Sequence, residues 1–265
     1  MPACLKKVCI IAEALNVSSF GCPAKQEDAM TRFLTGAIKV SVFVLVIIVN
    51  GFSQSRDRAA LIKEIDGLRE QLKQKELELL APSPEDRARF AEFLLQPNTG
   101  LARLLPREKY REKLSVREGG AYYSFTTQSN SYDSDPHIGL ERDYLNSGFA
   151  GADFGFIASI GDVPIESIGL ENQRVQYLAN LVAPMVEPEA REQQRRSGAG
   201  VIVGSQTYKG RVPVLVGGSY ILRSINYGRS DVLVAFRVVR QDDDGSLILQ
   251  WKRLRVFPLP DLTRQ

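Results

Sequence analysis

The sequence is short of the residues on which most catalytic and metal sites depend. Its three cysteines, Cys4, Cys9 and Cys22, all precede Met30, and His137 is the only histidine. From Met30 onward there is therefore no thiolate for a zinc site, an iron–sulfur cluster or a cysteine nucleophile. Any site that uses histidine as a general base has to use His137.

Familiar catalytic and cofactor motifs are missing as well. No G-x-S-x-G nucleophile turn is present in the sequence. The run GAGVIVG at 198–204 has one residue too many for a dinucleotide fingerprint, and it precedes a predicted strand where that fingerprint follows one. The sequence therefore indicates no cofactor.

Charge of one sign is not in excess. The 34 Lys and Arg residues nearly balance the 31 Asp and Glu residues. A nucleic-acid-binding face needs clustered basic side chains, so we expect no nucleic-acid partner. A chain of 265 residues, 44% of them hydrophobic, is nevertheless long enough to bury an ordinary core.

One long apolar run stands out near the start of the chain. Residues 40–49 are apolar except for one serine, with Arg32 and Lys39 before them and Ser53 and Ser55 after them. A basic start, a short apolar stretch and small residues at a cleavage position are typical of a secretory signal. We therefore expect residues 30–55 to be a signal peptide that is cut before Arg56.

That interpretation makes residues 1–29 a doubtful N-terminal extension and Met30 the true start. The alternative is an uncleaved membrane anchor that uses residues 33–52 as a tilted span, with Lys39 reaching toward the membrane interface. Basic residues flank the apolar run on both sides, so the positive-inside rule does not decide the orientation of such an anchor.

A helix with a partial heptad pattern is predicted over residues 58–80. Its apolar residues keep one stripe on one face, although Lys75 interrupts it. The stripe consists of Leu61, Ile65, Leu68, Leu72 and Leu79. We expect a helical stalk region over 56–106, in which this helix pairs with a second copy or a partner, or packs on the following domain.

The remaining segments predict an α+β domain over 107–265. Ser83 is expected to cap a helix that runs to about Gln96, followed by a short helical piece at 101–105. Strands are expected at 121–127 and 149–160 and helices around 171–182 and 189–196. Alternating apolar residues predict three final strands, at 219–226, 231–240 and 247–257, that form an antiparallel β-meander, with a bulge between Trp251 and Leu254.

One polar loop contains the candidate site residues. In YDSDPHIGLERD, the carboxylates of Asp133 and Asp135 could bind calcium or orient His137 as a base. The spacing departs from the EF-hand pattern, and we expect a solvated loop with no catalytic or metal role. Asp153, in an otherwise apolar stretch, is expected at an edge that faces water.

These observations favour an exported, non-catalytic module of the periplasm, envelope or exterior that binds an unidentified protein or envelope component. One alternative is an exported hydrolase or metal-binding protein that uses residues 133–143. Another is a single-pass membrane protein, a scaffold that self-associates through the Leu61–Leu79 stripe.

Overall fold

The computed structural model describes residues 57–263, in two units that divide between residues 66 and 67. Residues 57–66 are helical, and the second unit begins with helical residues 67–80. We call residues 57–80 the leucine helix. The predicted extension at 1–29 and the predicted signal or anchor at 30–55 lie outside the described residues. In the part that is described, no helix is long and apolar enough to cross a membrane.

Apart from the leucine helix, the helices of the second unit are short. They are α3 (Pro84–Arg89), α4 (Ala91–Leu94), α5 (Arg107–Tyr110), α6 (Gln173–Ala179) and α7 (Glu187–Ala199), with 3-10 turns η2 (Arg117–Gly120) and η3 (Ile165–Ser167). The strands are β1 (Thr99–Leu104), β2 (Tyr122–Tyr123), β3 (Ile138–Glu141), β4 (Tyr144–Asn146), β5 (Phe154–Gly161), β6 (Val201–Val203), β7 (Gln206–Tyr208), β8 (Arg211–Pro213), β9 (Ser219–Asn226), β10 (Ser230–Gln241) and β11 (Leu247–Val256).

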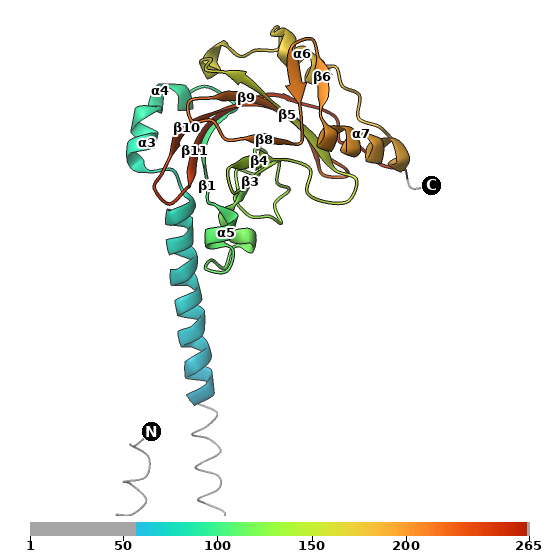
Figure 1. Cartoon of the computed structure of the whole chain (residues 1–265). Coiled ribbons are helices and arrows are strands. Elements are labelled where there is room, and N and C mark those ends of the chain that lie inside the picture. The colour runs from blue at the N-terminus through green and yellow to red at the C-terminus, as the bar shows by residue number, and fades with distance from the viewer. Residues whose placement is uncertain (1–56, 264–265) are drawn as a thin grey trace, which may run out of the picture. The chain divides into compact units, whose positions relative to one another are not determined.

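The largest sheet has five antiparallel strands in the order β1-β11-β10-β9-β5 (Figure 1). Its centre is the β9-β10-β11 meander, so the predicted α+β class and the antiparallel C-terminal region are confirmed. The predicted bulge is confirmed too. Leu233 pairs with Arg255 and Val234 pairs with Arg253, which leaves Leu254 as the extra residue on β11.

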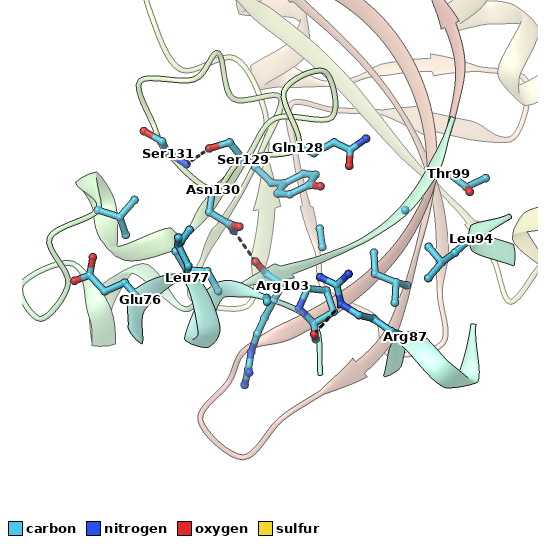
Figure 2. Close-up of a pocket in the computed structure, with 18 of the residues that line it drawn as sticks. Glu76, Leu77, Arg87, Leu94, Thr99, Arg103, Gln128, Ser129, Asn130 and Ser131 are labelled. Carbon is cyan, nitrogen blue, oxygen red and sulfur yellow. Dashed lines mark hydrogen bonds between the residues drawn. The ribbon is translucent and has the colours of Figure 1, made fainter. Parts of the chain in front are cut away.

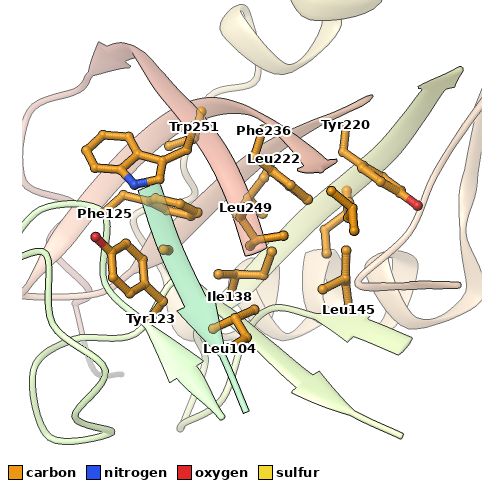
Figure 3. Packing of buried hydrophobic residues seen from close by; sticks show 14 of the residues in the cluster. Leu104, Tyr123, Phe125, Ile138, Leu145, Tyr220, Leu222, Phe236, Leu249 and Trp251 are labelled. Atoms are coloured by element: carbon orange, nitrogen blue, oxygen red, sulfur yellow. The ribbon is translucent and has the colours of Figure 1, made fainter. Parts of the chain in front are cut away.

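A smaller sheet, in the order β2-β3-β4-β8, packs on one face of the large sheet. The core between the sheets contains Tyr123 and Phe125 from the segment that includes β2, and Phe236, Leu249 and Trp251 from the meander (Figure 3). The rings of Phe125 and Trp251 meet edge to face with their centroids 5.5 Å apart. Such contacts add to the free energy gained by burying the rings.

The opposite face of the large sheet is covered by η3, α6 and α4. Phe154, Phe156, Ala158 and Ile160 alternate along β5 and all lie in this second core, as their spacing of two predicts. Ile157, one position out of phase, lies in the core between the sheets. Both faces of β5 are therefore buried, which explains its almost continuous apolar sequence.

Of the predictions for the region before residue 107, one is wrong and one is confirmed in part. Residues 101–105 are not helical, because the stretch alternates buried and part-buried positions and pairs with β11 as strand β1. Gly100 permits this pairing, since a Cβ atom there would lie 2.4 Å from the Trp251 ring. The helix capped by Ser83 is confirmed at its start, but α3 ends at Arg89, Phe90 interrupts it, and it resumes as α4, which ends at Leu94.

Candidate functional site

The three candidate residues of the polar loop do not lie together. Asp133 is exposed and forms an ion pair with Arg117 at 2.7 Å. Asp135 and His137 turn inward instead, and Ser230 at the start of β10 joins them. The prediction of a solvated loop is wrong for His137, whose side chain is fully buried.

His137 is fixed through both of its ring nitrogens. The backbone N–H of Phe125 donates a hydrogen bond to Nδ1 at 2.9 Å, and Nε2 lies 2.9 Å from the Oγ atom of Ser230. An Nδ1 atom that accepts a hydrogen bond bears no proton, so the ring proton is on Nε2. The ring therefore donates its Nε2–H to Ser230, and the Phe125 ring stacks on it at a centroid distance of 6.0 Å.

Ser230 links His137 to Asp135 through hydrogen bonds. Its hydroxyl accepts from His137 and donates to the Oδ2 atom of Asp135. In a catalytic triad the carboxylate holds the histidine and the free histidine nitrogen faces the serine, ready to take its proton. Here the nitrogen that faces Ser230 already holds the proton, so it cannot act as the base. The same three residue types are present, but the order of their hydrogen bonds is that of a structural network.

Asp135 is the acceptor at the end of this network. Its Oδ1 atom also accepts a hydrogen bond from Asn226 Nδ2 at 2.6 Å. Burial on its own raises the pKa of Asp135, but the His137 ring, whose Nε2 atom lies 3.5 Å from Oδ2, and hydrogen bonds from Ser230 and Asn226 outweigh it and hold the pKa below the ordinary value. The carboxylate is therefore kept ionised by groups that are themselves buried.

A second buried carboxylate lies next to the first. Asp153 accepts a hydrogen bond from the Tyr227 N–H at 2.9 Å and is paired with Arg229, whose Nε atom lies 3.6 Å from Asp135. Burial raises the pKa of Asp153 above its ordinary value despite these partners. The predicted water-facing position for Asp153 is wrong, because its side chain is buried and accepts a hydrogen bond from the turn between β9 and β10.

No metal site is formed by these residues. Across residues 57–263, no group of three or more His, Cys, Asp or Glu side chains gathers where it could hold an ion. Asp133 is separated from the other two candidates by its ion pair with Arg117, and Arg229 occupies the space between Asp135 and Asp153.

The second unit has a groove of about 530 Å³ alongside β1. Figure 2 shows Gln128, Ser129 and Asn130 on one side of the strand and Arg87 and Leu94 on the other. The leucine helix adds Leu77 and Leu80. We call this feature the β1 groove. It contains neither a histidine nor any group of side chains arranged for acid–base or nucleophilic chemistry.

The charged residues of the β1 groove are mostly basic. Its one carboxylate, Glu76, is buried and accepts hydrogen bonds from the backbone N–H and the hydroxyl of Ser115. Arg103 pairs with Asp242 at 3.0 Å. Lys73 and Arg87 are exposed and, within the described part of the chain, neither forms an ion pair. The rim thus offers two cations to a ligand.

The apolar stripe of the leucine helix is another exposed feature. Leu61 and Ile65, in the first unit, are 55% and 46% exposed, and Leu68 and Leu72, in the second, are 58% and 49% exposed. Four large apolar side chains at heptad spacing with about half their surface in water are unusual for a helix that acts alone.

Comparison with known proteins gives no family. No protein-family model, no curated protein and no solved structure matches this chain.

Ser230, Arg229 and the β1 groove were not found from the sequence. Ser230 lies 93 residues after His137, and nothing local marks it as a partner. For β1, a signal was present, because Leu101 and Arg103 alternate with the small or buried Gly100, Ala102 and Leu104. The run is short and lies between two prolines, so the alternation of side chains that is typical of a strand could not be recognised with so few residues.

Proposed function

We propose that the chain is an exported or envelope-associated, non-catalytic module that binds another protein. The observation that carries the proposal is that both ring nitrogens of His137 are held by hydrogen bonds. The only histidine of the chain uses one nitrogen to accept from Phe125 and the other to donate to Ser230, so it has no basic atom free for chemistry.

The surface of the second unit supports binding in place of catalysis. The β1 groove is lined by apolar and hydrogen-bonding side chains together with the edge of a strand, a combination common in sites that hold another polypeptide. Export is supported by the sequence around residues 40–49, which has the composition of a signal core.

A second candidate function is a membrane-anchored scaffold that pairs through the leucine helix, and the exposed stripe favours it. With Leu61 and Leu68 at heptad position d, Ile65 falls at position a, a combination that favours a parallel coiled coil of two helices. In a parallel pair, Glu64 at position g of one copy faces Arg69 at position e of the other, and their charges are complementary. The two candidates are compatible, since an exported module can also be a dimer.

The proposal is tested in cells that produce the full chain, by placing a photo-reactive amino acid at Gln128 in the β1 groove. Ile202 on the β6–β7 hairpin is the matched control, because it is 74% exposed and lies outside the groove. We expect light to give one discrete protein adduct from position 128 and none from position 202, with the chain in an exported or envelope fraction. The absence of an adduct at position 128, or a cytoplasmic chain that retains Cys22, would overturn the proposal.

A further inference from the structure

The β1 groove contains a strand edge on which some backbone groups have no hydrogen-bond partner in the described residues. β1 is the outermost strand of the large sheet and pairs only with β11. In an antiparallel pair, alternate residues direct their N–H and C=O groups toward the partner strand, and the residues between them direct theirs away. The direction taken by each residue of β1 can therefore be worked out.

Three hydrogen bonds settle that direction. The Asn98 carbonyl accepts from the Arg253 N–H at 2.8 Å, so the backbone N–H and C=O groups of even-numbered residues point toward β11. The Leu105 N–H donates to the Gly120 carbonyl, and the Arg103 carbonyl accepts from Asn130 Nδ2 at 2.6 Å. The backbone N–H and C=O groups of odd-numbered residues therefore point away from β11. Leu101 therefore directs both its N–H and its C=O away from the sheet, into the groove.

No group in the described residues is hydrogen-bonded to the backbone of Leu101 on that edge. At Arg103, the next odd-numbered residue, the side-chain amide of Asn130 donates to the backbone carbonyl in the way that the N–H of a neighbouring strand would. This contact covers one end of the edge and leaves the adjacent position open. Unpaired backbone groups on the edge of a strand can pair with another polypeptide.

We infer that the β1 groove binds an extended, acidic peptide segment of a partner protein, which adds to the large sheet as a strand next to β1. Main-chain hydrogen bonds to Leu101 supply the common part of the binding, and side chains of the peptide enter the apolar lining formed by Leu77, Leu80 and Leu94. The inference rests on the proposed binding function and specifies its ligand.

Charge decides which extended segment fits. Lys73 and Arg87 lie on the rim without ion-pair partners in the described residues, while Glu76 is occupied by Ser115. A carboxylate on the peptide would be attracted to the two cations, and a basic peptide would be repelled. A neutral or basic segment is therefore a poorer ligand than one with an Asp or Glu beside its apolar residues.

The test uses the purified full chain and a library of random linear peptides displayed on phage. We expect the enriched peptides to alternate apolar residues and to contain at least one Asp or Glu. Leu101→Pro removes the outward N–H without removing a bond to β11, and Leu101→Val, the matched control, keeps that N–H. Binding of the enriched peptides should fall about tenfold for the proline variant, the loss expected for one hydrogen bond with a desolvated partner, and stay near the original level for the valine variant.

A second arm leaves the protein unchanged. An enriched peptide is resynthesised in two versions, one with N-methyl groups on its odd-numbered residues and one with them on its even-numbered residues. Only the version that blocks the N–H groups facing β1 should lose binding. Lys73→Glu with Arg87→Glu should weaken binding of the acidic peptide, and the loss should shrink at high salt. No enrichment, selected peptides without carboxylates, or equal binding to the proline variant and both methylated peptides would overturn the inference. The adduct at Gln128 in cells tests the proposed function separately, since a folded partner would give that adduct and fail the peptide test.

Discussion

The backbone N–H of Phe125 lies 2.9 Å from Nδ1 of His137, and this contact determines what the only histidine can do. It places the ring proton on Nε2, which faces Ser230. A loop that looks like a source of a catalytic base is thereby joined to the start of β10. The consequences can be measured.

The first prediction concerns stability. His137→Ala should lower the free energy of unfolding by about 2 to 4 kcal/mol, because it leaves the Phe125 N–H without an acceptor and Ser230 without a donor, and opens a cavity between the sheets. Asp133→Ala in the same loop is the matched control and should change it by less than about 0.5 kcal/mol, as is usual for an exposed residue. Urea unfolding of both variants measures this. Equal small effects would mean that His137 is not part of the core.

The second prediction is a dependence of stability on pH. Burial raises the pKa of Asp153 in the folded chain, so the folded state binds a proton more tightly than the unfolded state does. The contribution of this group to stability is therefore most favourable below the unfolded pKa of about 3.9 and declines as pH rises through the folded pKa. Above that pH it is constant.

Asp153→Asn removes this contribution. The difference in the free energy of unfolding between wild type and variant should decrease as pH rises from about 3.9 and then level off. Asp143→Asn, at an exposed carboxylate, provides the control. Chemical unfolding across a pH series measures both differences. A difference that grows with pH would show that the pairing with Arg229 outweighs burial.

The third prediction concerns the leucine helix. If Ile65 and Leu68 face a second copy, then Ile65→Lys with Leu68→Lys should convert a dimer of the full chain to a monomer, because charged side chains would occupy adjacent core positions. Leu77→Lys, equally exposed but off the stripe, should leave the dimer intact. Sedimentation of the full chain in detergent reports the mass.

Charge exchange gives an independent check on that pairing. Arg69→Glu should weaken the dimer by placing two acidic residues opposite each other, and adding Glu64→Arg should restore it. A monomeric wild type, or a double variant no stronger than the single one, would rule out the parallel arrangement.

The sequence and the structure agree where the pattern is long. Val232, Val234, Phe236 and Val238 alternate over enough of β10 to predict a strand, and Gly245, at a φ of 88°, permits the turn before β11. β1 was missed because six residues between prolines carry little periodicity. The Asp135–Ser230 contact joins residues 95 positions apart, and a contact between distant segments depends on the whole fold.

The strand predicted at residues 121–127 is confirmed only in part, again because contacts between distant segments decide the local structure. Residues 121–127 are rich in aromatic and β-branched residues, yet only Tyr122–Tyr123 forms a strand, because the chain turns at residues 125–128, where the Phe125 N–H donates to His137. The burial of His137, with the Phe125 ring stacked on it, depends on how distant segments of the chain pack together. No local pattern in the loop indicates it.

If the Asp135–His137–Ser230 network is structural, Ser230 should not react with reagents that label activated serines, and this measurement is the most direct test. The full chain is treated with an organofluorophosphonate, which labels serines that an adjacent base activates, with a serine hydrolase in the same tube as the positive control. Mass spectrometry of the peptides should show the hydrolase labelled and the Ser230 peptide unmodified. An adduct on Ser230 that disappears in His137→Gln would show that His137 activates it, and the protein would then be a hydrolase.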